Sequence, residues 1–170
     1  MTRKWPPRSR SRSTGSDGTG GADRPRPTPS PLDVAARILA RAPRTEAELA
    51  ARLVARGYRE TTAERTVARC RELGYVGDER LAFDRARRLR ERGAGSLRIA
   101  AELEARGLSA AVVAAAVAES LDGEPELAWA RRVLARERVT RPAQAWRLLA
   151  GRGFPEEVVA DLVGDPADDS

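Results

Sequence analysis

The side chains of this 170-residue chain that could do chemistry are mostly arginines. Histidine is absent and Cys70 is the single cysteine, so the commonest general base and any His-paired nucleophile are missing. Adjacent carboxylates occur at Asp78-Glu79 and Glu156-Glu157, where we expect the first turns of helices, which favour acidic residues. The chain has no Cys/His cluster and no phosphate-binding glycine loop. We therefore predict no catalytic site, no metal site and no cofactor, and we look for function in the binding of anionic surfaces.

The densest run of arginines covers residues 84–92. At 3.6 residues per turn, Arg85, Arg88 and Arg92 share one stripe of a helix whose other face carries apolar residues. This stripe could bind phosphates or an acidic protein groove, or it could be a solvated helix face, and the sequence leaves both readings open. One or two further arginines fall on the second predicted helix of each repeated unit described below: Arg52, Arg56, Arg98, Arg106, Arg147 and Arg152. We predict that these nine arginines form the partner-binding surface, although arginine abundance by itself often reflects genomic base composition.

The formal net charge of +6 is concentrated near the N-terminus. Residues 1–31 carry seven Lys/Arg against two Asp and are rich in Ser, Thr, Gly and Pro. This composition predicts a disordered basic arm, which is either a solvated tail or a nonspecific contact to nucleic acid.

A triplet of arginine, glycine and an apolar residue occurs three times, as Arg56-Gly57-Tyr58, Arg106-Gly107-Leu108 and Arg152-Gly153-Phe154. The glycines of successive triplets are 50 and 46 residues apart. A period of this size indicates one supersecondary unit that stacks on copies of itself. Amphipathic helical segments flank each triplet, and we place each glycine between the second and third helix of a unit, in a left-handed conformation.

The helical periodicity predicts an all-α protein of about nine helices, with no strand. Thr45 with Glu48 and Thr61 with Glu64 are spaced as capping boxes, and we expect Asp78 to be the N-cap of the fourth helix. We expect Tyr75 and Phe83 to be packing residues. The helices group into three tandem three-helix repeats in an elongated, curved stack, followed by a frayed acidic tail. The predicted segments are 1–31 (arm), 32–76, 77–122 and 123–165 (repeats) and 166–170 (tail).

No apolar run is long enough to span a membrane, and the N-terminus lacks the apolar core of a secretory signal. We therefore expect a cytoplasmic monomer with no membrane partner.

The junction between the first two repeats resembles a known family signature. Residues 72–82 read Glu-Leu-Gly-Tyr-Val-Gly-Asp-Glu-Arg-Leu-Ala and are similar to the hGYhDDERFA motif of the RecX family of recombination regulators. Residues 92–108 are similar to the family segment G-x-x-x-I-x-x-E-L-x-x-K-G-h, with arginine at position 106 in place of the frequent lysine. Gly77 and Leu81 replace the usual Asp and Phe. The matching motif residues, mainly structural, are Gly74, Tyr75, Asp78, Glu79, Arg80, Gly107 and Gly153.

The resemblance implies a specific role. RecX proteins are tandem three-helix repeats that bind the filament of the RecA recombinase in its groove and span neighbouring protomers. They inhibit RecA's ATP hydrolysis, strand exchange and co-protease activity, by limiting filament growth or promoting disassembly, and some members bind DNA. We therefore predict a non-enzymatic modulator of RecA, acting in DNA repair, recombination and the SOS response, with single- or double-stranded DNA as a further candidate partner.

Two other classes of function remain open from the residues alone. A sequence-specific DNA-binding regulator is disfavoured because Gln144 is the only amide side chain in the chain, so base-reading groups are scarce. A nonspecific nucleic-acid binder would act through residues 1–31, and deletion of that arm would abolish its activity.

Overall fold

The computed structural model describes residues 29–164, and all regular secondary structure in this range is helical. Its helices are α1 (Pro31–Leu39), α2 (Glu46–Val54), α3 (Glu60–Glu72), α4 (Asp78–Glu91), α5 (Ser96–Glu104), α6 (Ala110–Ser120), α7 (Glu126–Glu137), α8 (Pro142–Gly151) and α9 (Glu156–Val163). Helix α1 begins inside the segment predicted as an arm. Residues 1–28 of that arm and the predicted tail lie outside the described residues.

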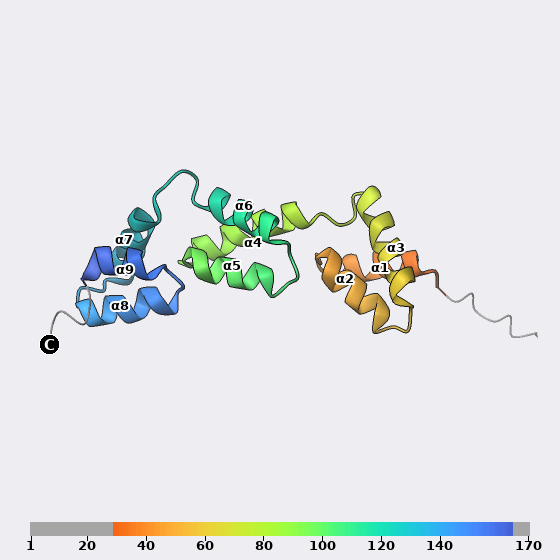
Figure 1. Cartoon of the computed structure of the whole chain (residues 1–170), viewed down its shortest axis with the longest axis horizontal. Helices are drawn as coiled ribbons and strands as arrows, with labels where there is room; N and C mark the ends of the chain where they lie inside the picture. The colour runs from red at the N-terminus through yellow and green to blue at the C-terminus, as the bar shows by residue number, and fades with distance from the viewer. Residues whose placement is uncertain (1–28, 165–170) are drawn as a thin grey trace, which may run out of the picture.

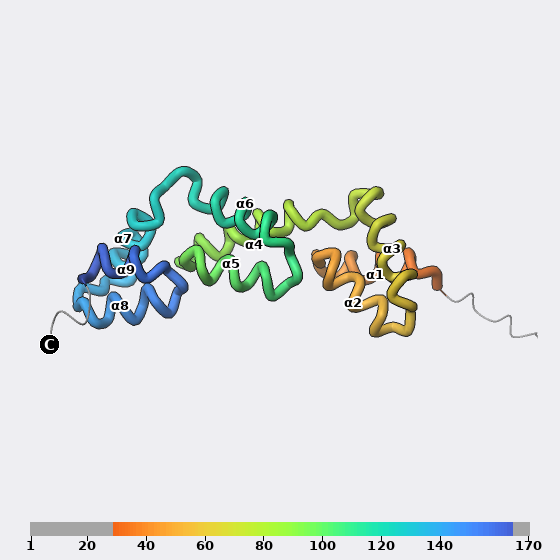
Figure 2. Tube along the Cα trace, viewed as in Figure 1, coloured from red at the N-terminus to blue at the C-terminus, as the bar shows by residue number. Residues whose placement is uncertain are grey.

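The helices form three groups that lie in a row (Figures 1 and 2). We call α1–α3 unit 1, α4–α6 unit 2 and α7–α9 unit 3. Each unit has its own apolar core, built largely from Ala, Leu and Val, and no buried residue belongs to two of these cores. The closely packed helix pairs all join helices of the same unit. The predicted all-α fold of three tandem three-helix repeats in an elongated stack is thus confirmed.

Short polar caps explain where several helices begin. Thr45 and Glu48 form the predicted capping box at α2, and Ser109 caps α6. Each such cap satisfies backbone N–H groups that have no partner within the helix. The predicted box at Thr61 is wrong, because α3 begins two residues earlier with extended Arg59 as its N-cap and with no side-chain cap. Thr61 therefore lies inside the helix.

The repeated triplets make the turn between the second and third helix of each unit. Gly107 and Gly153 have φ values of +77° and +75°, a left-handed conformation that favours glycine. The apolar residue that follows packs back on its own unit, since Leu108 and Phe154 are buried. The triplet thus reverses the chain in a short space and presents its backbone at the edge of the unit.

The aromatic side chains differ in whether they pack against the cores of the units, and the cysteine is buried. Phe83 packs against the core of unit 2, and Trp129 and Trp146 pack against that of unit 3. The expectation that Tyr75 packs is wrong, because its side chain lies in the linker after α3 and is 55% exposed, whereas the next residue, Val76, is buried. Cys70 is fully buried, and this burial raises the pKa of its thiol.

No helix within residues 29–164 combines the length and the apolar character needed to cross a bilayer.

Candidate functional site

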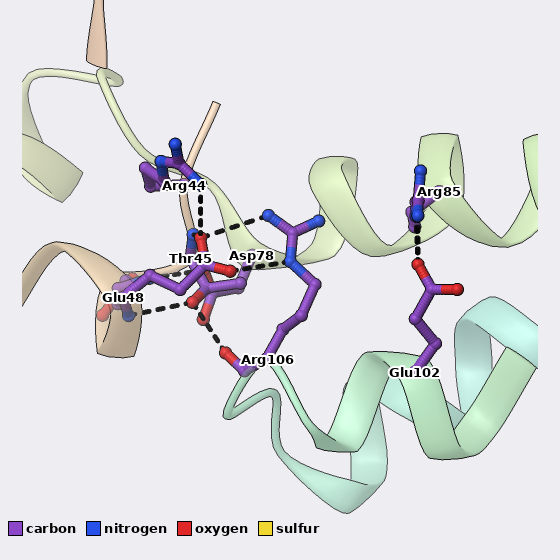
Figure 3. A network of polar contacts seen from close by, with 8 residues as sticks. Arg44, Thr45, Glu48, Asp78, Arg85, Glu102 and Arg106 are labelled. Carbon is purple, nitrogen blue, oxygen red and sulfur yellow. Dashed lines mark hydrogen bonds and ion pairs between the residues drawn. The ribbon is translucent and has the colours of Figure 1, made fainter. Parts of the chain in front are cut away.

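The joint between units 1 and 2 is a network of polar contacts around the first turn of α2 (Figure 3). Asp78, the first residue of α4, accepts a hydrogen bond from the Glu46 N–H at 2.9 Å. The prediction that Asp78 caps its own helix is therefore wrong. Gly77 is the N-cap of α4 and makes no side-chain bond, while the Asp78 carboxylate caps the neighbouring helix instead. A carboxylate at a helix N-terminus also interacts favourably with the helix dipole.

Arg106 completes this joint from the turn between α5 and α6. Its Nε and Nη2 atoms donate to the two carboxylate oxygens of Glu48 at 2.8 and 3.1 Å, and its carbonyl accepts from the Thr45 hydroxyl at 2.8 Å. Both side chains are about three-quarters covered. The hydrogen bond to Arg106 lowers the pKa of Glu48, and the same bond raises the pKa of Arg106. This bidentate pair leaves little of Arg106 for an external partner.

The joint between units 2 and 3 repeats this plan with backbone groups. The Gly95 N–H donates to the Arg152 carbonyl at 2.8 Å, and the Leu97 N–H donates to the Gly153 carbonyl at 3.0 Å. Gly153 lies so close to the first turn of α5 that a Cβ there would be 2.5 Å from the backbone nitrogen of Arg98. The Arg-Gly turn of each later unit therefore rests on the second helix of the unit before it.

A buried ion pair reinforces the second joint. Glu126, the first residue of α7, accepts from the Ser96 N–H at 2.6 Å, as Asp78 does from Glu46 in the first joint. Glu126 also lies 3.5 Å from the guanidinium of Arg90, whose residue exposure is only 6%. Burial lowers the pKa of Arg90, and the charge of Glu126 opposes that shift. Loss of the Glu126 carboxylate would leave a buried charge without a partner, which is strongly destabilising.

The nine predicted partner-binding arginines divide into two groups. Arg85, Arg106 and Arg152 are half-buried and ion-paired with Glu102, Glu48 and Glu137, so the structure uses them internally. The other six are exposed and make no ion pair among residues 29–164: Arg52, Arg56, Arg88, Arg92, Arg98 and Arg147. The predicted stripe on α4 thus presents Arg88 and Arg92 to solvent, while Arg85 turns toward α5.

The remaining motif residues shape the linker between α3 and α4. Gly74 has a φ of +71°, and the Tyr75 N–H returns to the Cys70 carbonyl at 2.8 Å, which closes the end of α3. Glu79 and Arg80 are exposed in the first turn of α4. Their mainly structural role and the binding role of the exposed arginines both stay predictions.

Sequence reasoning missed the residues that hold the units together. Glu48 appeared only as part of a capping box, and Glu126 and Arg90 were not singled out. Their partners lie 58, 30 and 36 positions away, so local spacing carries no signal for them. The one available signal was the recurrence of an acidic residue, Asp78 and then Glu126, at the start of the first helix in units 2 and 3.

No group of His, Cys, Asp or Glu within residues 29–164 is arranged to hold a metal ion.

Comparison with known proteins identifies the family to which this chain belongs. A family model described as RecX, first three-helix domain, matches residues 32–70. The regulatory protein RecX of Mycobacterium ulcerans (strain Agy99) is 35% identical over 137 residues, which cover 75% of this chain and 79% of that protein. The chain belongs to the RecX family. The regulatory protein RecX of Stenotrophomonas maltophilia (strain K279a) is 34% identical over 130 residues, covering 71% of this chain and 77% of that protein.

The fold of the family is also known from a crystal structure. RecX from Lactobacillus salivarius superposes with a TM-score of 0.62 at 14% sequence identity, covering 78% of this chain and 92% of that one. The resemblance noted in residues 72–108 is thereby confirmed at the level of the RecX family and its fold.

Proposed function

We propose that this chain is a non-enzymatic regulator of the RecA recombinase, which it inhibits by binding along the groove of the RecA–DNA filament. Membership of a family of regulatory proteins supports the general role. The observation that carries the finer proposal is the elongated row of three units with exposed arginines on each of them. A row of similar charged units suits a partner that is itself a repeating polymer.

The proposed mechanism is a shift between filament states. Units that bridge neighbouring recombinase subunits would bind one subunit spacing better than another. A ligand shifts such an equilibrium only by its difference in affinity for the two states. The backbone hydrogen bonds at the second joint restrict the spacing of units 2 and 3, and this spacing would set which filament state the chain favours. ATP hydrolysis, strand exchange and co-protease activity all depend on the filament, so all three would fall together.

Arg88, on α4, and Arg92, the C-cap of that helix, are the arginines best placed for this contact. They lie in the central unit, both are exposed, and neither makes an ion pair within residues 29–164. Exposed guanidinium groups can bind carboxylates or phosphates in bidentate fashion without first breaking an internal pair.

The test is ATP turnover by RecA on single-stranded DNA, with the purified chain added at substoichiometric ratios. We expect turnover to fall well before the ratio reaches one chain per recombinase subunit. The double variant Arg88→Glu/Arg92→Glu should need roughly tenfold more protein for the same inhibition, since two lost charged contacts are worth about 1.4 kcal/mol or more.

The matched control is Arg65→Glu/Arg131→Glu, which makes the same charge change at two other exposed arginines, on α3 and α7. It should inhibit as the unaltered chain does. Equal inhibition by the unaltered chain and the α4 variant, with unchanged circular dichroism, would remove Arg88 and Arg92 from the mechanism. No inhibition by the unaltered chain would refute the proposed function.

A further inference from the structure

A groove of about 240 Å³ between α1 and α2 is lined by five arginines and by no carboxylate. The arginines are Arg37, Arg41, Arg44, Arg52 and Arg56. We call this the five-arginine groove. Its only other lining residues are Val34 and Ile38, and Ile38 is buried in the core of unit 1.

The arginines form two short rows that meet at the loop between the helices. Arg37 lies in α1 and Arg41 follows its C-cap, and Arg52 and Arg56 stand in the same way at the end of α2. All four side chains line the same groove. All four are exposed, and none makes an ion pair in the described part of the chain. The two rows therefore hold four unneutralised charges.

Arg44 sits in the loop between the two rows. Its nearest carboxylate is Glu48 at 3.9 Å, and that carboxylate already receives two hydrogen bonds from Arg106. The Nε–H of Arg44 is buried and has no acceptor among residues 29–164. A buried donor without an acceptor costs roughly 1–3 kcal/mol. The Nε–H of Arg44 is thus able to donate a hydrogen bond to a ligand.

Five like charges around one hollow repel each other, and nothing in the core of unit 1 requires them. Phosphate groups would relieve this repulsion, because each presents oxygens that match the fork of a guanidinium. An acidic protein surface fits less well. Protein partners are usually anchored by apolar side chains in a pocket, and the groove exposes only part of Val34 for such an anchor.

We propose that the five-arginine groove binds the phosphodiester backbone of a nucleic acid strand. Binding here is independent of base sequence, because the groove has no Asn or Gln and arginine contacts to phosphate carry no base information. The site lies in unit 1, whereas Arg88 and Arg92 belong to unit 2. Binding of nucleic acid in this groove does not depend on the proposed action on RecA, because the chain would bind the strand in the absence of RecA.

The test is fluorescence anisotropy of a labelled oligothymidylate titrated with the full-length chain in the absence of RecA. The groove variant is Arg41→Gln/Arg52→Gln/Arg56→Gln. The control Arg65→Gln/Arg131→Gln/Arg141→Gln removes the same charge at exposed arginines outside the groove. Near 50 mM salt we expect the groove variant to lose roughly 10- to 100-fold in affinity, and the slope of log K against log salt to fall by about 2, or 0.7 per lost contact. The control should change by less than about threefold, as expected for weak long-range charge effects.

Three results would overturn the proposal. Equal losses in the groove and control variants would mean that only total charge matters. No loss in either variant would place any nucleic acid binding elsewhere, including residues 1–28. Displacement of the oligonucleotide by polyglutamate at an equal concentration of charge would assign the groove to an acidic protein instead. Because RecA is absent, none of these results bears on its inhibition.

Discussion

The two joints between units follow one plan but are built from different groups. In both, an acidic residue at the start of a unit caps the second helix of the unit before it, Asp78 on Glu46 and Glu126 on Ser96. The first joint adds a partly solvated pair of side chains, Glu48 with Arg106. The second adds two backbone hydrogen bonds and the buried Arg90.

This difference teaches which part of the molecule can adjust. Backbone hydrogen bonds to a helix turn allow one geometry, and a buried charge cannot lose its partner cheaply. Long side chains in partial contact with water allow several geometries and are weakened by salt. We therefore expect units 2 and 3 to move as one body, and unit 1 to swing on the joint at Arg106.

Removal of the acidic cap should give the largest difference in stability loss between the two joints. Glu126→Ala leaves Arg90 buried without its carboxylate and should cost about 3–5 kcal/mol of unfolding free energy. Asp78→Ala, at the equivalent position, loses one hydrogen bond to a charged group and should cost about 1.5–3 kcal/mol. Urea unfolding followed by circular dichroism measures both. Equal losses would show that the two joints are alike.

The turn glycines give a smaller, graded effect. Gly153→Ala combines a left-handed φ, worth roughly 1–2 kcal/mol, with a steric conflict against Arg98 that adds about 1–3 kcal/mol. Gly57→Ala is the matched control, because its φ is also positive but nothing lies within 4 Å of the added Cβ. The difference between the two unfolding free energies isolates the contact with α5. A loss as large at Gly57 would contradict this account of the second joint.

The smallest effect concerns pH and the first joint. The bond to Arg106 places the pKa of Glu48 below its ordinary 4.5. The stabilisation is therefore complete above that value and is lost as pH falls through the lowered pKa. The charged groups facing Glu48 are Arg106 and Arg44, with Asp78 near Arg106; the raised pKa of Arg106 keeps its guanidinium protonated over this range.

The measurement compares the unaltered chain with Glu48→Gln in urea at a series of pH values. The difference in unfolding free energy should be constant near neutral pH and shrink toward zero in acid. A difference that does not change with pH would show that the charge of Glu48 does not stabilise the joint.

Local patterns in the sequence predict the units well and the joints poorly. The spacing of apolar residues and the three Arg-Gly turns place the helices, and Thr45 with Glu48 marks one helix start correctly. Thr61 has the same spacing but fails, because the short turn after Gly57 starts α3 earlier.

Candidate binding residues are harder to predict because arginines look alike in a sequence. Arg106 and Arg56 occupy equivalent triplets, yet one is held by Glu48 and the other lines an open groove. The deciding partners lie in another unit or on another helix, so only the folded chain reveals which arginine is already in use. Arg37, Arg41 and Arg44 were missed for the same reason.

Proline at the first position of α8 has a consequence for how long such a row can grow. Pro142 stands where α2 has Glu46 and α5 has Ser96, the residues whose N–H groups are bonded across the joints. Proline has no N–H to donate. At the other end, α1 starts with Pro31, which has no carboxylate to offer. Two molecules meeting end to end would thus lack both halves of the bond that links units within one molecule, and this mismatch opposes polymerisation of the chain by its own repeat.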